Sequence, residues 1–188
     1  MVAAVNPGNP QIDEQLASPE ALDDIVPLRL DRNGVSAYIS IMRGCNNCCS
    51  YCVVPYTRGA ERSRDPYTIV REAEEAFAAG YKEVNLLGQN VDSYLWKAPE
   101  DCPEHCGESV NFAQLLEKVA AISPQLRVRF STSYPSDITD EVLYTMAAHS
   151  NICRHIHFPV QSGSDAMLEK MRRKYDRKWY LERVARIR

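Results

Sequence analysis

The stretch 44–52 reads GCNNCCSYC and holds four of the chain's seven cysteines. Three of them, Cys45, Cys49 and Cys52, follow the spacing C-x3-C-x2-C, and Cys48 lies inside the first gap. Thiolates are soft ligands that suit zinc, copper(I) and iron–sulfur clusters. A loop this short can direct several thiolates at one centre, so the stretch predicts a metal site.

Zinc and a ferredoxin-type cluster are the first alternatives. Structural zinc takes four tetrahedral ligands, usually from two cysteine pairs separated by a long insert. Here the pairs adjoin, and the neighbouring side chains of Cys48 and Cys49 point apart in extended chain. A ferredoxin-type cluster takes four cysteines in the run C-x2-C-x2-C-x3-C, an order that this stretch does not follow. The spacing therefore argues against both.

Three thiolates leave one iron of a 4Fe-4S cluster without a protein ligand. An open coordination position is typical of a catalytic metal site rather than a structural one. The C-x3-C-x2-C spacing, with the aromatic Tyr51 before the last cysteine, resembles the signature of radical S-adenosylmethionine (SAM) enzymes. The resemblance implies a 4Fe-4S cluster on Cys45, Cys49 and Cys52, with SAM as second cofactor at the open iron. Cys48 is left without a role.

The composition bounds the class of protein. A length of 188 residues suits one domain, and a net charge of -3 does not by itself point to nucleic acid. An odd number of cysteines, most of them crowded together, argues against a secreted disulfide framework and for a cytoplasmic location. No apolar run approaches the ~20 residues of a membrane span. The N-terminus lacks the basic and apolar regions of a signal peptide.

Residues 1–33 differ from the rest of the chain. They contain four prolines and several acids, without hydrophobic periodicity, which predicts a linker or mobile arm. Residues 34–188 are expected to form one domain.

Strands and helices are expected to alternate along this domain. The predicted strands cover 35–42, 81–87, 126–130 and 152–159, and the predicted helices follow Asp65, Val110, Thr139 and Ser164. Gly80 is a suitable residue to end the first helix. Four such alternations predict an α/β fold with parallel strands and right-handed crossovers, a partial (β/α) barrel.

Each predicted strand ends in small or polar residues. In parallel α/β barrels the loops after the carboxyl ends of the strands build the active site. The cysteine loop and the segments 88–90, 131–133 and 161–163 are therefore expected to share one rim.

Three longer stretches resemble the methylthiotransferase family of radical SAM enzymes. They are ISIMRGCNNCCSYCVVPYTRG, NLLGQNV and HFPVQSGSD, and the resemblance covers about residues 35–180. VVPYTRG, the following ERSR and NLLGQN are most similar to the branch that adds a methylthio group to C2 of N6-isopentenyladenosine beside the tRNA anticodon. Related branches act on threonylcarbamoyladenosine in tRNA or on a ribosomal-protein aspartate. A non-catalytic iron–sulfur or electron-transfer module is the alternative of another class.

The resemblance also implies site residues and partners. Candidate SAM contacts are Tyr51, Gln89, Asn90, Ser131 and Gln161. Their alternative roles are helix capping and satisfaction of loop backbone. Candidate contacts to RNA phosphates or to the methionine carboxylate are Arg58, Arg62 and Arg64, with a solvated turn as the alternative. The implied partners are the tRNA anticodon stem-loop and an electron donor such as flavodoxin or ferredoxin, with no membrane involved.

Members of this family carry parts that this sequence does not show. They have an N-terminal domain whose three cysteines hold a second cluster, a C-terminal RNA-binding TRAM domain, and a barrel of six strands. No cysteine precedes Cys45. We therefore expect a truncated radical-SAM core that does not complete methylthiolation alone.

Three further segments carry candidate ligands. Cys102, His105 and Cys106 form a weak zinc candidate, for which a solvent-exposed loop is the favoured alternative. Cys153, His155 and His157 would share one face of the fourth strand, lining the barrel. The segment 170–188 is basic with interleaved aromatics, which suits RNA, although an amphipathic barrel helix is slightly favoured.

Overall fold

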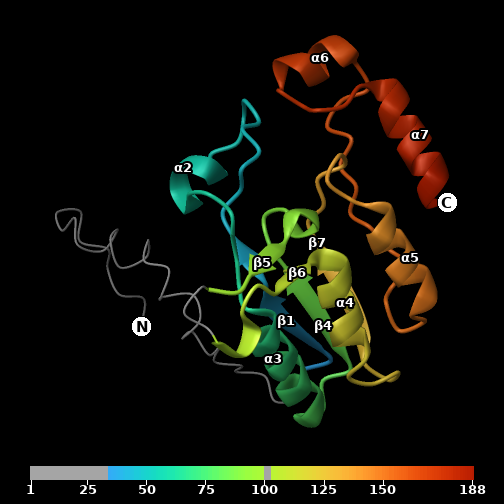
Figure 1. The fold of residues 1–188 in the computed structure, drawn as a ribbon. Coiled ribbons are helices and arrows are strands. Elements are labelled where there is room, and N and C mark those ends of the chain that lie inside the picture. The colour runs from blue at the N-terminus through green and yellow to red at the C-terminus, as the bar shows by residue number, and fades with distance from the viewer. Residues whose placement is uncertain (1–33, 100–102) are drawn as a thin grey trace, which may run out of the picture.

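A three-stranded parallel sheet forms the centre of the computed structural model, which describes residues 34–99 and 103–188 (Figure 1). Its strands are β1 (Ser36–Ser40), β4 (Glu83–Leu87) and β7 (Arg127–Ser131), in the order β1-β4-β7. Both pairings are parallel, with Ala37 opposite Val84 and Val84 opposite Val128. The crossovers run through helices, which confirms the α/β class expected from the sequence.

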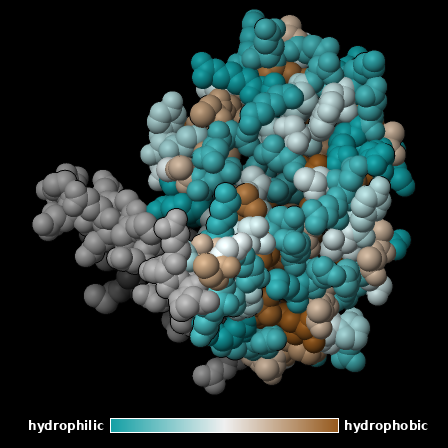
Figure 2. All heavy atoms as spheres, in the orientation of Figure 1, coloured by the Kyte–Doolittle hydropathy of each residue, from teal (hydrophilic) through white to brown (hydrophobic). Residues whose placement is uncertain are grey.

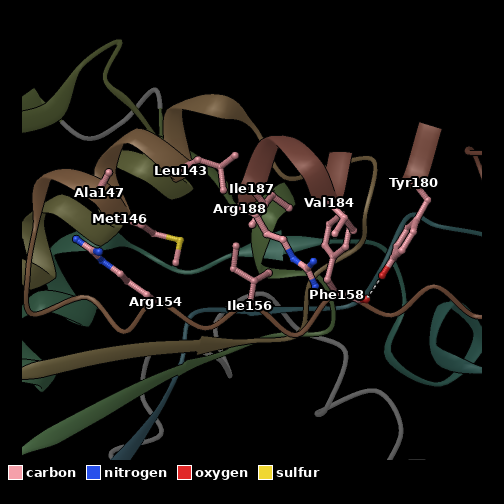
Figure 3. A pocket seen from close by; sticks show the side chains of 10 residues that line it. All are labelled: Leu143, Met146, Ala147, Arg154, Ile156, Phe158, Tyr180, Val184, Ile187 and Arg188. Carbon is pink, nitrogen blue, oxygen red and sulfur yellow. Dashed lines mark hydrogen bonds between the residues drawn. The ribbon is translucent and has the colours of Figure 1, made fainter. Parts of the chain in front are cut away.

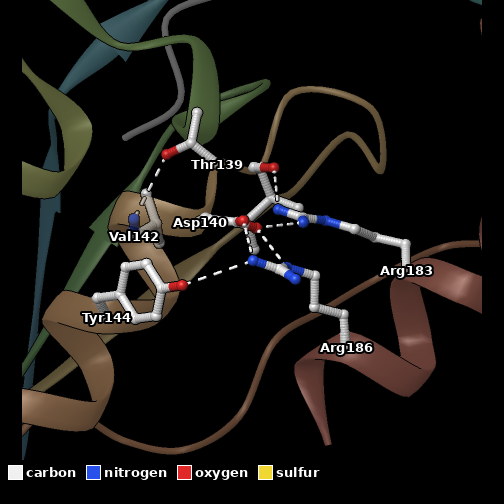
Figure 4. Close-up of polar contacts among 7 residues, drawn as sticks. Thr139, Asp140, Val142, Tyr144, Arg183 and Arg186 are labelled. Atoms are coloured by element: carbon white, nitrogen blue, oxygen red, sulfur yellow. Dashed lines mark hydrogen bonds and ion pairs between the residues drawn. The ribbon is translucent and has the colours of Figure 1, made fainter.

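Three of the predicted helices are present, with starts within one residue of the predicted ones. Helix α3 (Pro66–Ala78) begins after Asp65, whose carboxylate accepts a hydrogen bond of 2.7 Å from the backbone N–H of Thr68. It ends before Gly80, which has φ +100°. Helix α4 (Phe112–Ala120) begins with a capping box between Asn111 and Gln114. Helix α5 (Asp140–Ala148) begins after Thr139, whose hydroxyl accepts from the N–H of Val142 (Figure 4).

The core lies on one face of the sheet. Alternate strand residues such as Ile39, Leu86 and Val128 are fully buried, and they pack against apolar residues of α3 and α4. The other face is more polar. It presents Tyr38, which is 62% exposed, and Glu83, whose carboxylate accepts a 2.7 Å hydrogen bond from Nε of Arg129. In a (β/α) barrel this second face is the one that looks inward.

The predicted fourth strand, 152–159, is wrong. Only Ile152 forms a parallel bridge, opposite Val128, at the outer edge of β7. The chain then leaves the sheet, and its carbonyl groups are used by tyrosines instead of a strand ladder. The hydroxyl of Tyr180 donates to the carbonyl of Phe158 at 2.7 Å, and that of Tyr175 to the carbonyl of Pro159 at 3.1 Å.

Two helices follow this segment. Helix α6 (Asp165–Lys170) begins after Ser164 as predicted, but the Ser164 side chain makes no capping hydrogen bond. Helix α7 (Arg177–Ile187) is capped by Asp176, which accepts from the N–H of Trp179 at 2.7 Å. A helix was the favoured prediction for the basic segment 170–188, and α7 confirms a helix there, although its start after Asp176 was not predicted.

An ion-pair network fastens α7 to α5. Arg183 and Arg186 both pair with the carboxylate of Asp140 at the start of α5, and Arg183 also donates to the carbonyl of Ile138 (Figure 4). Hydrogen bonds from Arg186 and Arg183 lower the pKa of Asp140 to about 2. The carboxylate is therefore ionised throughout the ordinary pH range, which keeps the network intact.

Short elements complete the fold. After β1 the chain forms β2 (Met42–Arg43), paired antiparallel with β3 (Arg62–Ser63), and between them lies helix α2 (Val54–Arg58). The short 3-10 segment Val91–Ser93 is followed by the hairpin of β5 (Leu95–Lys97) and β6 (Ser109–Asn111). The segment 103–105 is a second 3-10 turn. None of these elements was predicted from the sequence.

A cavity of about 560 Å³ lies between α5, the segment 154–158 and α7 (Figure 3). Apolar side chains including Met146, Ile156 and Val184 line it, together with Arg154 and Arg188. The cavity is thus separate from the cysteine loop.

The surface is mostly hydrophilic on the face shown in Figure 2, with small hydrophobic areas between polar ones. In the part of the chain that the structure describes, no helix is long and apolar enough to cross a membrane.

Candidate functional site

Three of the four predicted rim segments meet at the carboxyl end of the sheet. The amide of Gly44 donates to the side-chain oxygen of Gln89 at 2.7 Å, which ties the cysteine loop to the end of β4. The amide of Gly88 donates to the carbonyl of Ser131 at 3.3 Å, and that of Val91 to the carbonyl of Thr132 at 3.0 Å. The fourth segment, 161–163, follows Val160, whose carbonyl accepts a hydrogen bond of 3.2 Å from the hydroxyl of Tyr175.

The three cysteines of the spacing differ from the fourth. Cys45, Cys49 and Cys52 are half-buried, whereas Cys48 is exposed. Burial raises the pKa of Cys45, and the Glu61 carboxylate and the other two thiols raise it further, against a backbone N–H of Asn47 that lowers it. Those three thiols are therefore near enough to interact electrostatically, whereas Cys48 directs its sulfur towards the carbonyl of Asn46 at 3.9 Å.

The donor set of this loop is the one that suits a 4Fe-4S cluster. Among residues 34–99 and 103–188, no three His, Cys, Asp or Glu side chains converge closely enough to hold one metal ion. Ligands of a 4Fe-4S cluster each bind a different iron, so they stay apart. Three partly buried, soft donors on one short loop are the donor set that such a cluster needs.

Hydrogen bonds between buried polar groups hold the cysteine loop in place. Asn47, which is 4% exposed, donates to Asp137 Oδ2 at 3.1 Å. Asn90 donates to the same oxygen at 2.6 Å and accepts from the backbone N–H of Tyr134 at 3.2 Å. Both ends of the Asn90 amide thus have protein partners, and its proposed contact with SAM stays a prediction.

A buried carboxylate lies next to this network. Both oxygens of Asp92 and the hydroxyl of Ser133 are buried without a hydrogen-bond partner of ordinary geometry. Burial raises the pKa of Asp92 to about 7, and the negative charge of Asp137 adds to this. The Ser133 hydroxyl and the Tyr134 N–H lie near enough to Asp92 to offset part of this rise in its pKa. Asp92 therefore changes charge in the neutral range.

We expect Asp92→Asn to stabilise the protein at alkaline pH. The folded-state pKa of about 7 lies above the ordinary 3.8, so stability is greatest below the unfolded pKa and is lost as pH rises towards 7. The variant should gain on the order of a few kcal/mol at pH 8 and little at pH 4, since one pKa unit is worth about 1.4 kcal/mol. Thermal unfolding at both pH values checks this, with Glu74→Gln, an exposed carboxyl of α3, as control. Equal shifts at both pH values would contradict it.

The segment 170–175 contacts the cysteine loop through hydrogen bonds. The amide of Ser50 donates to the carbonyl of Met171 at 3.2 Å, and its hydroxyl to the carbonyl of Lys170 at 2.8 Å. The guanidinium of Arg173 donates to Sγ of Cys49 at 3.1 Å. Sequence reasoning missed this contact, although the basic and aromatic run there was the available signal.

The remaining predicted SAM contacts are Tyr51, Ser131 and Gln161. Tyr51 is 51% exposed and directly precedes Cys52. The Ser131 hydroxyl lies 3.4 Å from that of Thr132. Gln161 has an exposed side chain and φ 66°, in the left-handed region. Their contacts with SAM stay predictions.

The three arginines predicted to contact RNA differ in solvent exposure. Arg58 is exposed at the end of α2, and Arg62 is half-buried on β3. Arg64 donates to Glu72 at 2.7 Å and to the carbonyl of Ser40 at 2.9 Å, and its side chain is only 10% exposed. Because this internal ion pair covers the guanidinium, Arg64 is poorly placed to bind RNA.

The two other groups of candidate ligands differ in outcome, and a solvent-exposed loop was the favoured prediction for the first of them. Nδ1 of His105 lies 3.0 Å from Glu108, and its ring stacks on Tyr67 at 4.1 Å, which accounts for this histidine by packing. Cys106 is exposed, and Cys102 lies outside the described residues. The prediction for Cys153, His155 and His157 is wrong, because the segment forms no strand and both histidines are exposed.

The model of the Radical SAM superfamily matches residues 39–188. The chain belongs to this superfamily. A 4Fe-4S cluster and SAM are therefore its cofactors, as the cysteine spacing predicts.

Curated relatives match along the whole chain. A tRNA-2-methylthio-N(6)-dimethylallyladenosine synthase of Amoebophilus asiaticus is 58% identical over 100% of this chain, and one of Bacteroides thetaiotaomicron is 51% identical over the same share. In both cases the match covers 40% of the relative. The chain thus spans less than half the length of the relatives it matches.

Solved structures support the fold. The radical SAM methyltransferase TsrM of Kitasatospora setae, solved with cobalamin and a [4Fe-4S] cluster, has a TM-score of 0.60 at 20% identity, over 83% of this chain and 29% of that one. The cobalamin-dependent radical SAM enzyme OxsB has a TM-score of 0.55 at 13% identity, over 78% of this chain and 21% of that one. At these identities the likeness concerns the fold alone.

Proposed function

We propose that residues 34–188 are the radical-SAM domain of a tRNA methylthiotransferase that modifies C2 of N6-isopentenyladenosine beside the anticodon. The observation that carries the proposal is the cysteine loop: three half-buried thiols of the C-x3-C-x2-C spacing lie at the carboxyl end of a parallel sheet. The names of the relatives, at up to 58% identity, support the substrate.

Cys45, Cys49 and Cys52 are the proposed ligands of the 4Fe-4S cluster. The cluster and SAM together supply the radical chemistry when bound. The chain's own residues hold the loop, through Gln89 at its start and Ser50 at its centre. The proposed SAM contacts are Tyr51, Gln89, Asn90, Ser131 and Gln161. Gln89, Asn90 and Ser131 lie at strand ends beside the loop, and Tyr51 lies within it.

RNA and an electron donor are the proposed partners. Arg58 and Arg62 lie on the short elements that flank the cysteine loop, and guanidinium groups bind phosphates well. The target base has to leave its stack to reach the rim, as single-stranded bases do in other base-modifying enzymes. A flavodoxin or ferredoxin is proposed as reductant. A thiol-held cluster suits the reducing cytoplasm.

A labelled RNA tests the proposal directly. The protein is reconstituted with iron and sulfide under anaerobic conditions, reduced with dithionite, and given SAM and an anticodon stem-loop deuterated at C2 of isopentenyladenosine. We expect deuterium in the 5′-deoxyadenosine product, because the family's radical removes hydrogen from that carbon. Mass spectrometry of the nucleoside measures it.

Two control RNAs separate the alternatives. An unmodified adenosine at the same position should give no deuterated product. Transfer from a threonylcarbamoyladenosine RNA alone would assign the related branch instead. A reduced cluster whose electron paramagnetic resonance spectrum does not change on addition of SAM would indicate a non-catalytic iron–sulfur module.

A further inference from the structure

Arg173 is held in a fixed position beside the cysteine loop. Its guanidinium lies 4.1 Å from the ring centre of Tyr134 and 5.2 Å from that of Tyr175, and its Nε donates to the Tyr175 hydroxyl at 3.0 Å. The backbone is fixed as well, since the Arg173 amide donates to the carbonyl of the buried Leu168 at 2.9 Å. Cation–π contacts and these hydrogen bonds leave the side chain little freedom.

This cation points at a sulfur rather than at a carboxylate. Within residues 34–99 and 103–188, the polar partners of the Arg173 guanidinium are the Tyr175 hydroxyl and Sγ of Cys49, the latter at 3.1 Å from Nη1. Burial alone lowers the pKa of Arg173, but hydrogen bonds to Tyr175 and Cys49 raise it above its ordinary value. A neutral thiol is a weak acceptor, whereas a thiolate forms a strong charge-assisted hydrogen bond. The contact therefore places the positive charge of Arg173 directly beside a sulfur that is a proposed cluster ligand.

We infer that Arg173 acts through Cys49 to raise the reduction potential of the iron–sulfur cluster. This inference rests on the cluster site proposed above. Reduction adds one electron from the reductant to the cluster and its ligands, with no bond broken and no proton moved. A fixed positive charge that donates a hydrogen bond to a ligand sulfur stabilises the more negative, reduced state. Arg173 is thus a positioning residue for the electron-accepting step.

Redox titration of the reconstituted protein tests the inference. The reduced cluster is counted by its paramagnetic resonance signal as dithionite and dye mediators set the potential. For Arg173→Gln we expect about tenfold less reduced cluster, relative to oxidised, at a fixed potential, which for one electron is a fall of about 59 mV. Arg172→Gln is the matched control, because it removes the same charge one position away from an exposed side chain. It should leave the potential unchanged at equal iron content.

Arg173→Lys keeps the test decisive if the glutamine variant assembles poorly. Lysine keeps the charge but cannot form the guanidinium fork that reaches Tyr175 and Cys49 together. We expect this variant to bind iron and to show a smaller fall in potential. An unchanged potential in an iron-loaded Arg173→Gln would overturn the inference. If the glutamine variant loses its cluster, an unchanged potential in an iron-loaded Arg173→Lys would overturn it instead. Loss of iron from both would also overturn it, because Arg173 would then act in assembly. Failure of the unchanged protein to bind a cluster would overturn the proposed function itself.

Discussion

Replacement of Cys45, Cys49 or Cys52 by alanine is expected to abolish cluster binding, whereas Cys48→Ala is expected to leave it intact. The first three thiols are half-buried and near one another, while Cys48 is exposed with its sulfur towards the carbonyl of Asn46. A cluster with three protein ligands already has one open iron, and loss of one of the three thiolates leaves a second iron exposed to solvent and reductant. Metal binding depends on every thiolate being in place.

The measurement is iron and sulfide per chain after anaerobic reconstitution and gel filtration. The unchanged protein and Cys48→Ala should each retain about four irons, the content of one 4Fe-4S cluster. Each of the other three variants should fall to the background iron content. Cys106→Ala carried through the procedure without added iron defines that background, because Cys106 is an exposed cysteine outside the loop. Full iron in any of those three, or loss of iron in Cys48→Ala, would change the ligand set.

Local signals in the sequence predicted much of this fold. Asp65 and Thr139 precede helices because a side-chain oxygen there satisfies a free helix N–H, and both of these bonds are present. The alternation of strand and helix predicted the parallel sheet. A helix that connects two parallel strands packs back onto the sheet in a right-handed crossover. The superfamily match then confirmed the class of site that the cysteine spacing indicated.

Contacts between distant parts of the chain were not predictable in this way. The hydrogen bond from Arg173 to Cys49 joins residues 124 positions apart, and no local pattern encodes it. The fourth strand failed for a similar reason. Its apolar, β-prone residues look like a strand, but the carbonyls of Phe158 and Pro159 accept from tyrosine hydroxyls 22 and 16 positions further along the chain. The sequence predicted Arg64 as a candidate RNA contact, but its guanidinium forms an ion pair with Glu72 of helix α3.

Gly44→Ala is expected to distort the cysteine loop and to prevent cluster binding. Gly44 has φ +83°, and a Cβ placed there would lie 2.0 Å from the backbone oxygen of Ala60 and 2.7 Å from that of Gly59. No side-chain rotation relieves a contact with backbone, so the two segments must separate. That separation breaks the 3.2 Å hydrogen bond from the Cys45 amide to the Gly59 carbonyl, directly beside the first cluster ligand.

Gly59→Ala provides the matched control. Gly59 also has a positive φ, +72°, but a Cβ there meets nothing within 4 Å. Its substitution should therefore carry only the conformational cost of about 1–3 kcal/mol. For Gly44→Ala we expect a loss on the order of 3–5 kcal/mol, and thus a fall in Tm of roughly 10 °C at about 2–4 °C per kcal/mol.

Thermal unfolding and iron content should separate the two glycine variants. Gly59→Ala should keep its iron, because the loop geometry at Cys45 is preserved. Gly44→Ala should lose both iron and stability, since the Gly44 amide also anchors the loop to Gln89. If both variants unfold at the same temperature and hold the same iron, the close approach of Gly44 to Ala60 has no part in shaping the site, and the loop would then be positioned chiefly by its contacts with Asp137 and the segment 170–173.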